Sequence, residues 1–277
     1  MSIAYFIEGI PGSGKTTYAQ RLHDYLVSQG KQVELYNEGD LHPIDLAWCS
    51  ITSKNNFDEL CETHSNYREQ ILSHSKFLGN TVVTAYTKVK VNDADVSLYD
   101  DFSVYEIYRT NDFQRFKDTH LSLWKTFNTS HKKNTIYIFE CIFLQNHINE
   151  LILKFTLTKK QMLLYFQDLI GSLNDIETHV LYIKPMNIKQ TFDFVIKERK
   201  SYNINYKDWI ELVIEYLEKT KEGPKLGYSG YQGALRYFTD RQEIECKLIP
   251  KLNTKSIIFE HHGDYNKVFH EITNYIK

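Results

Sequence analysis

Short apolar runs alternate with amphipathic stretches along the chain, and five of these runs have the length and composition of buried strands. Aromatic and β-branched side chains dominate them, and glycine or polar residues bound them. We predict strands at residues 3–8, 32–36, 134–140, 178–183 and 256–259. Between them apolar residues recur at spacings of three and four, which predicts helices.

This alternation of strands and helices predicts an α/β fold with a mostly parallel five-stranded sheet and helices on both faces. Ligands of such sheets bind at the carboxyl ends of the strands. Residues 41–133 are longer than an ordinary connection and mostly helical in pattern, with an extended stretch at 81–84. We therefore expect a single domain, residues 1–277, in which 41–133 form a mostly helical insertion that binds an acceptor.

A glycine-rich motif follows the first predicted strand directly. Gly9-Ile10-Pro11-Gly12-Ser13-Gly14-Lys15-Thr16 fits the Walker A pattern G-x-x-x-x-G-K-[ST] at every fixed position, and a helical pattern follows it. In such loops backbone N–H groups surround phosphate oxygens, the lysine reaches the β- and γ-phosphates, and the Ser/Thr hydroxyl binds Mg²⁺. We predict that ATP with Mg²⁺ binds at Gly9, Pro11, Gly12, Ser13, Gly14, Lys15, Thr16 and Thr17, with Thr16 as a metal ligand and an exposed Lys15 as a catalytic group.

Phosphoryl transfer also needs an acid near the metal or the attacking hydroxyl. Glu140 follows four apolar or aromatic residues at the end of the third predicted strand. A carboxylate after such a run emerges at the ligand edge of the sheet. We predict that Glu140 is catalytic, either as a metal ligand or as a general base, and the pattern leaves both roles open.

The Glu8–Thr17 segment, the strand-end Glu140, the 182–185 strand and the basic helix after it together resemble the P-loop small-molecule kinases, nearest the thymidylate kinase and deoxynucleoside kinase group. The resemblance implies the three-layer P-loop NTPase fold, a helical acceptor-binding region after the second strand and an arginine-bearing lid after the fourth. The chain departs from the family at Glu140-Cys141, where such kinases commonly carry Asp-Arg. The departure leaves open whether the acceptor is a nucleoside or nucleotide.

The resemblance places Glu38, Asp40 and His42 at the acceptor, where a carboxylate could orient or deprotonate a hydroxyl. Arg109, with Arg115 as a further candidate, would bind an anionic acceptor through its guanidinium. The alternatives are an ordinary polar loop for the first three residues and helix-surface arginines for the other two.

The lid is expected in the cationic stretch after the fourth strand. Lys197, Arg199 and Lys200 end an amphipathic helical pattern, and a guanidinium engages two phosphoryl oxygens at once, so Arg199 is the predicted catalytic cation. Arg236 and Arg241 are second choices. The alternative is that the helix dipole alone favours cations at this helix end.

The composition and net charge limit the classes of binding partner that we expect. Lys and Arg number 33 against 35 Asp and Glu, giving a net charge of −2, and this balance argues against a nucleic-acid partner. The four cysteines form no CxxC pair, so neither a structural zinc site nor a disulfide framework is indicated. No apolar run approaches the ~20 residues of a membrane span. We expect a soluble, cytoplasmic protein with no membrane partner.

Two function classes fit these features. The first is an ATP-dependent phosphotransferase (kinase) whose partners are a nucleoside triphosphate and a small hydroxylated or anionic acceptor. The second is a nucleotide-binding ATPase or switch protein without such an acceptor. The long insertion favours the kinase, because a pocket for a second substrate needs walls. The identity of the acceptor, the choice between ATP and GTP and the oligomeric state stay open.

Overall fold

The computed structural model describes residues 1–92, 95–201 and 207–277. The chain divides into two compact units. Unit 1 comprises Met1–Leu35 and Asn128–Lys277, and unit 2 comprises Tyr36–Phe127. Unit 2 therefore begins and ends a few residues earlier than the insertion expected at residues 41–133.

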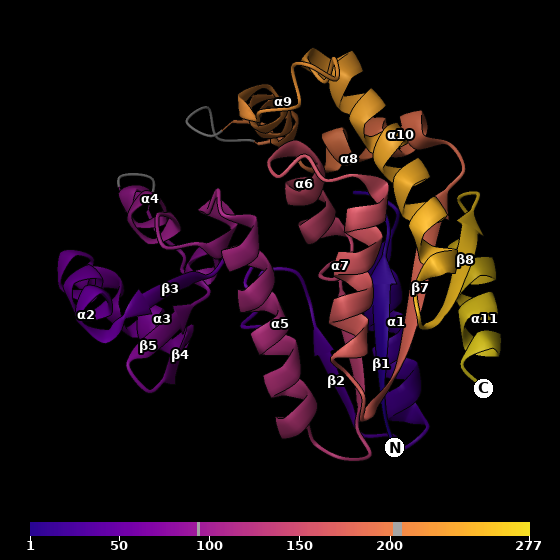
Figure 1. Cartoon of the computed structure of the whole chain (residues 1–277), viewed down its shortest axis with the longest axis horizontal. Helices are drawn as coiled ribbons and strands as arrows, with labels where there is room; N and C mark the ends of the chain where they lie inside the picture. Colours follow the sequence, from indigo (N-terminus) through magenta and orange to yellow (C-terminus); the bar gives the residue numbers. More distant parts are fainter. Residues whose placement is uncertain (93–94, 202–206) are drawn as a thin grey trace. The chain divides into compact units, whose positions relative to one another are not determined.

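Unit 1 contains a five-stranded parallel sheet flanked by helices (Figure 1). The predicted α/β class and the five parallel strands are thereby confirmed. The order across the sheet places the first strand at the centre, between two strands that come much later in the sequence. In spatial order the strands are β2 (Val33–Tyr36), β6 (Ile136–Glu140), β1 (Ser2–Glu8), β7 (Ile176–Pro185) and β8 (Lys255–His261).

Seven helices of the described part of the chain lie wholly within unit 1. They are α1 (Lys15–Ser28), α6 (Gln145–Leu153), α7 (Lys159–Gly171), α8 (Ile188–Glu198), α9 (Trp209–Lys219), α10 (Gly230–Leu248) and α11 (Tyr265–Tyr275).

The alternating side chains of β1 join two helical layers to the sheet. Tyr5 and Ile7 face one side, where they belong to an apolar cluster that includes buried residues of α1 and α11. Phe6 faces the other side and packs on Phe143, which in turn contacts Phe166 of α7. Figure 1 shows α7 and α10 across this second face. A central strand covered on both faces reads as a continuous apolar run, which is why its position could be predicted.

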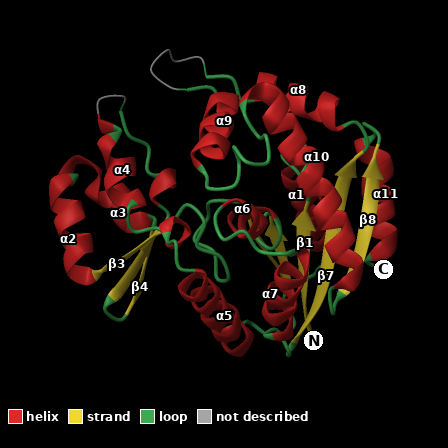
Figure 2. Ribbon diagram, turned by 45° about the horizontal axis from the view of Figure 1, so that its top comes forward, coloured by secondary structure: helices red, strands yellow, loops and turns green. Residues whose placement is uncertain are grey.

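Unit 2 has a second sheet that the helical pattern did not predict. Its three antiparallel strands lie in the order β3 (Ser50–Ser53), β5 (Thr81–Thr84), β4 (Ser75–Leu78), and only 81–84 was expected to be extended (Figure 2). An apolar cluster that includes Phe57, Val82 and Phe102 packs its helices against the sheet. The helices are α2 (Lys54–Thr63), α3 (Arg68–Ser73), α4 (Ser97–Ser103) and α5 (Phe113–Ser130), the last of which ends just beyond the unit boundary.

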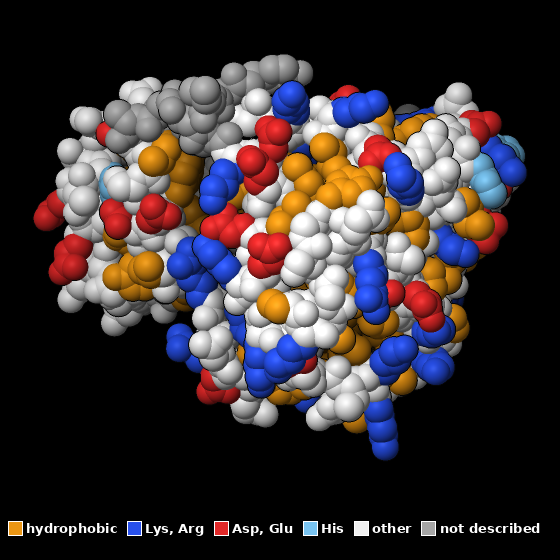
Figure 3. Space-filling model, turned by 90° about the horizontal axis from the view of Figure 1, so that it is seen from above, with side chains coloured by type: hydrophobic (Ala, Val, Ile, Leu, Met, Phe, Trp, Pro, Cys, Tyr) orange, Lys and Arg blue, Asp and Glu red, His pale blue; other side chains and the backbone are white. Residues whose placement is uncertain are grey.

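The charges on the surface and the hydrophobicity of the helices agree with the composition of the chain. On the face drawn in Figure 3, basic and acidic side chains are interspersed among polar and hydrophobic ones. Among the described residues, no helix combines the length and the apolar character needed to cross a bilayer.

Candidate functional site

The glycine-rich loop, Gly9–Gly14, joins the carboxyl end of β1 to the start of α1. No side chain caps the N-terminus of α1, a helix of 14 residues. Its first N–H groups and the positive end of its dipole therefore favour an anion at this position. Gly12 has a φ of +80°, and a Cβ there would lie 3.1 Å from the Thr191 carbonyl oxygen of α8. A larger residue at position 12 would be strained and would press on α8.

Thr16 and Glu140 meet at the carboxyl edge of the sheet. β1 and β6 run parallel with Ile7 opposite Glu140, so the end of β6 lies beside the start of the glycine-rich loop. The Thr16 Oγ1 hydroxyl donates a hydrogen bond to Glu140 Oε1 at 3.2 Å. Thr16 is exposed, whereas Glu140 is buried. A hydroxyl and a carboxylate are hard oxygen donors of the kind that Mg²⁺ prefers, so this pair fits the metal that the motif implies.

Lys15 is buried, and our expectation of an exposed lysine was wrong. Its side chain is only 6% exposed, and Nζ donates a hydrogen bond to the Ile10 carbonyl oxygen at 3.1 Å. The same carbonyl accepts the N–H of Ser13 at 3.2 Å, so the loop curls around its own lysine. Of the other predicted loop residues, Ser13 is buried, Pro11 is half-buried and Thr17 is exposed.

Glu8, at the end of β1, is a buried acid to which the sequence analysis gave no role. Its Oε1 accepts the N–H of Phe143 at 2.7 Å, and its Oε2 accepts the N–H of Gln145 at 3.1 Å. The side chain is fully buried, and this desolvation raises the pKa of Glu8 to about 8. Glu8 thus anchors the segment that follows Glu140. A signal was available, because Glu8 ends its strand just as Glu140 does.

The predicted acceptor residues Glu38, Asp40 and His42 lie in unit 2, after β2. Glu38 accepts a hydrogen bond from Trp48 Nε1 at 3.2 Å, and Asp40 lies 3.1 Å from the ammonium of Lys88. The His42 side chain is half-buried. Desolvation of its imidazole ring lowers the pKa of His42 to about 4. His42 is therefore neutral at pH 7. Its Nδ1 accepts the N–H of Ile44 at 3.3 Å.

The two arginines considered for an anionic acceptor are on the surface of unit 2. Arg109 ends a short 3₁₀ turn, Ile107–Arg109, and its side chain is 56% exposed with Nε 4.0 Å from Glu106. Arg115 is exposed in the first turns of α5. Their part in acceptor binding stays a prediction.

The predicted lid cations lie at the end of α8, with Lys197 in its last turn and Arg199 and Lys200 just after it. Lys197, Arg199 and Lys200 are all exposed, and the Arg199 guanidinium lies over the Trp209 indole ring at 5.5 Å. This contact is a cation–π interaction that accounts for the present position of Arg199. The two second choices differ from each other. Arg236 is exposed and pairs with Asp240, whereas Arg241 is buried and paired inside unit 1, so it does not reach out to a phosphate.

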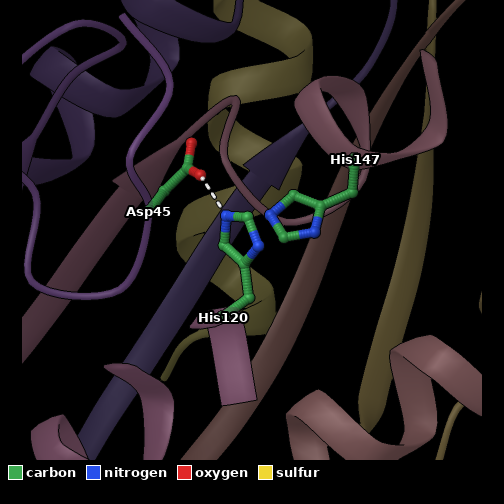
Figure 4. A group of neighbouring side chains, drawn as sticks. All are labelled: Asp45, His120 and His147. Atoms are coloured by element: carbon green, nitrogen blue, oxygen red, sulfur yellow. Dashed lines mark ion pairs between the residues drawn. The ribbon is translucent and has the colours of Figure 1, made fainter. Parts of the chain in front are cut away.

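Unit 2 also contains a buried acid–imidazole pair that sequence reasoning missed. Asp45 Oδ1 lies 3.4 Å from His120 Nε2 and accepts the Tyr108 hydroxyl at 2.7 Å (Figure 4). His120 Nδ1 faces the Phe116 carbonyl at 2.9 Å, which assigns the Nδ1 proton. Both side chains are almost fully buried. No sequence signal marked them, because they are far apart in the chain and fit no motif.

The comparisons with known proteins give little. No family model and no curated protein matches the chain. Among solved structures, a match titled as the structure of the YGR205w protein is 14% identical, covers 94% of this chain and 86% of that one, and has a TM-score of 0.37. This likeness is too distant to carry an argument about function.

Proposed function

We propose that the chain is an Mg²⁺-dependent, ATP-dependent phosphotransferase with the P-loop NTPase fold, acting on a small hydroxylated or anionic metabolite. The observation that carries the proposal is the 3.2 Å contact between Thr16 Oγ1 and Glu140 Oε1. An accidental glycine turn before a helix would need no acid beside its threonine. The pairing of a Walker A hydroxyl with a strand-end carboxylate is the arrangement that phosphoryl transfer requires.

Each loop group has a distinct task in this proposal. The N–H groups of the glycine-rich loop and of the first turn of α1 bind the phosphates. Lys15 exchanges its hydrogen bond to the Ile10 carbonyl for one to a phosphate oxygen, where its charge stabilises the transferred group. Thr16 and Glu140 would hold Mg²⁺, which when bound neutralises charge on the β- and γ-phosphates.

The proposal keeps the predicted acceptor-binding residues, which all belong to unit 2. Glu38 and Asp40 have carboxylates that can accept a proton or a hydrogen bond from a hydroxyl, and Arg109 is exposed and can pair with an anionic group. His42 can act there only as a neutral hydrogen-bonding group, because its pKa of about 4 leaves it uncharged at pH 7. This favours a hydroxyl over a second phosphate as its partner.

An acceptor screen tests the proposal. The protein is incubated with Mg·ATP and a library of hydroxylated and anionic metabolites, and mass spectrometry reports any compound that gains one phosphate. The Lys15→Ala variant is the matched negative control. The expected result is a small set of phosphorylated products in the wild-type reactions only. ATP hydrolysis without any phosphorylated metabolite would favour the ATPase or switch hypothesis over the kinase hypothesis. Absence of ATP binding would contradict both hypotheses.

A further inference from the structure

A fully buried arginine connects the glycine-rich loop to two helices. Arg241 of α10 is 1% exposed. Its Nε donates to Glu245 Oε1 at 2.7 Å, its Nη1 to Asn149 Oδ1 at 3.2 Å, and its Nη2 to the Gly9 carbonyl oxygen at 3.4 Å. One planar group thus reaches α10, α6 and the first residue of the loop.

At Gly9 the hydrogen bond from Arg241 constrains a backbone that has little room to move. Its φ is +151°, and a Cβ there would lie 2.5 Å from the Ile183 carbonyl oxygen of β7. The backbone of Gly9 is therefore confined on one side by β7 and hydrogen-bonded on another by Arg241. Because the peptide unit is planar, holding the Gly9 carbonyl also sets the direction of the Ile10 N–H. The start of the glycine-rich loop is fixed in this way.

Asn149 ties the same guanidinium to the segment that carries the acid. It lies in α6, which begins soon after Glu140, and its Oδ1 also accepts the Tyr237 hydroxyl. The ion-pair partner Glu245 is completely buried and accepts the Tyr182 hydroxyl of β7. The network spans β7, α6, α10 and the glycine-rich loop.

Buried ion pairs are often replaceable by apolar packing without loss of stability, so stability alone does not account for a buried arginine here. A guanidinium differs from an ammonium in presenting a rigid fork of donors, which suits a role in fixing several acceptors at once. Arg241 uses its three nitrogens on three separate acceptors.

We propose that Arg241 is a positioning residue that holds the Gly9 peptide in register with the Glu140 segment and thereby keeps the glycine-rich loop in its phosphate-binding form. The consequence for nucleotide binding rests on the proposed function. The effect on the loop itself can be measured without any nucleotide.

The test compares Arg241→Lys with Arg68→Lys, the same exchange at an exposed arginine of α3 that belongs to no predicted site. We expect Arg241→Lys to raise the Kd for Mg·ATP, measured by titration calorimetry, at least tenfold. It should also speed amide hydrogen exchange in residues 9–14 of the free protein at least tenfold. Arg68→Lys should change both by less than twofold. An Arg241→Lys protein with wild-type affinity and wild-type exchange in the loop would overturn the proposal.

Two further variants separate positioning from stability. Glu245→Gln removes the ion pair but keeps the bond to Gly9, so it should lower the melting temperature while loop exchange and Kd stay within threefold of wild type. If Arg241→Lys does not fold, Asn149→Ala, which removes one anchor of the guanidinium, should raise loop exchange and Kd at least threefold; unchanged values would overturn the proposal. If the wild type itself does not bind Mg·ATP, the proposed function fails, and loop exchange alone decides the role of Arg241.

Discussion

The Thr16 hydroxyl and the Glu140 carboxylate lie 3.2 Å apart, although 124 positions of sequence separate them. Parallel pairing of β1 with β6 brings the loop after one strand beside the last residue of the other. The distance is short because both groups leave the sheet at its carboxyl edge, where ligands of parallel sheets bind.

Replacing Glu140 with Gln should lower kcat about 100-fold while changing the Kd for Mg·ATP less than threefold. The amide keeps the shape but loses the charge that acts on metal or nucleophile, whereas the loop still supplies the phosphate contacts. Steady-state kinetics on an acceptor from the screen, with calorimetry for binding, would measure the two effects. Glu260→Gln, at an exposed position of β8, is the control and should leave both unchanged. Wild-type kcat in Glu140→Gln at saturating Mg²⁺ would move the role to another acid.

Lys15→Ala should reduce phosphoryl transfer by about 10³-fold, because no other group of the loop brings a positive charge to the transferred phosphoryl. The far-ultraviolet circular dichroism spectrum should stay unchanged, since the hydrogen bond of the Lys15 side chain to the Ile10 carbonyl lies within its own loop. Lys31→Ala, an exposed lysine just after α1, should behave as wild type. Near-full turnover in Lys15→Ala would refute the proposed chemistry.

Arg199→Lys should lower kcat tenfold or more, equal to about 1.4 kcal/mol, with an unchanged melting temperature. Lysine keeps the charge at the end of α8 but lacks the fork that engages two phosphoryl oxygens. To act on a phosphate the guanidinium must leave the Trp209 ring, and an exposed cation–π contact costs only about 0.5–1 kcal/mol to break. Arg68→Lys, at an exposed position of α3, is the control. Unchanged turnover with a lowered melting temperature would assign Arg199 to packing on Trp209.

The free energy of unfolding should fall as the pH rises from 6.5 to 8, because of Glu8. In the folded protein its pKa is about 8, against an ordinary value of 4.5, so across this window the folded state holds a proton that the unfolded state has lost. The loss reaches about 1.4 kcal/mol per pH unit. The window starts at 6.5 because His42, with its pKa lowered to about 4, destabilises the folded state only as the pH falls below 6.5.

Urea unfolding of the wild type and of Glu8→Gln at several pH values would test this linkage. Glutamine cannot ionise, so the variant should lose the slope that Glu8 contributes, and Glu260→Gln should retain it. Equal slopes in wild type and Glu8→Gln would show that Glu8 is not protonated in the folded protein at neutral pH.

The sheet of unit 1 could be predicted because four of its strands contain an apolar run, and the central one is covered on both faces. The observed strands contain most of the expected residues, and β1 ends at Glu8 as expected. The sheet of unit 2 could not be predicted, since β3 and β4 are four-residue strands that contain only one and two apolar residues, respectively. Such strands are defined by pairing with β5, which no local pattern reveals.

In the candidate site, too, features set by a local motif or strand pattern could be predicted, whereas features set by contacts in the folded chain could not. The motif located the glycine-rich loop, and the strand pattern located Glu140. The buried state of Lys15 depended on an acceptor within the loop, and the contact of Arg241 with Gly9 depended on how α10 packs. A regular helical spacing around Arg241 gave no sign that its face would be turned into the interior.

The strand order β2-β6-β1-β7-β8 has a consequence for how the chain is made. The strand β1 leaves the ribosome before both of its partners, which lie more than about 100 residues further along. At synthesis rates of about 5–20 residues per second, the two faces and both hydrogen-bonding edges of β1 remain uncovered for on the order of ten seconds until β6 is made. They remain uncovered longer on the side of β7. During that interval β1 is a hydrophobic strand without neighbours, a typical substrate for a holding chaperone, and overexpression that outpaces such protection should favour aggregation through this segment.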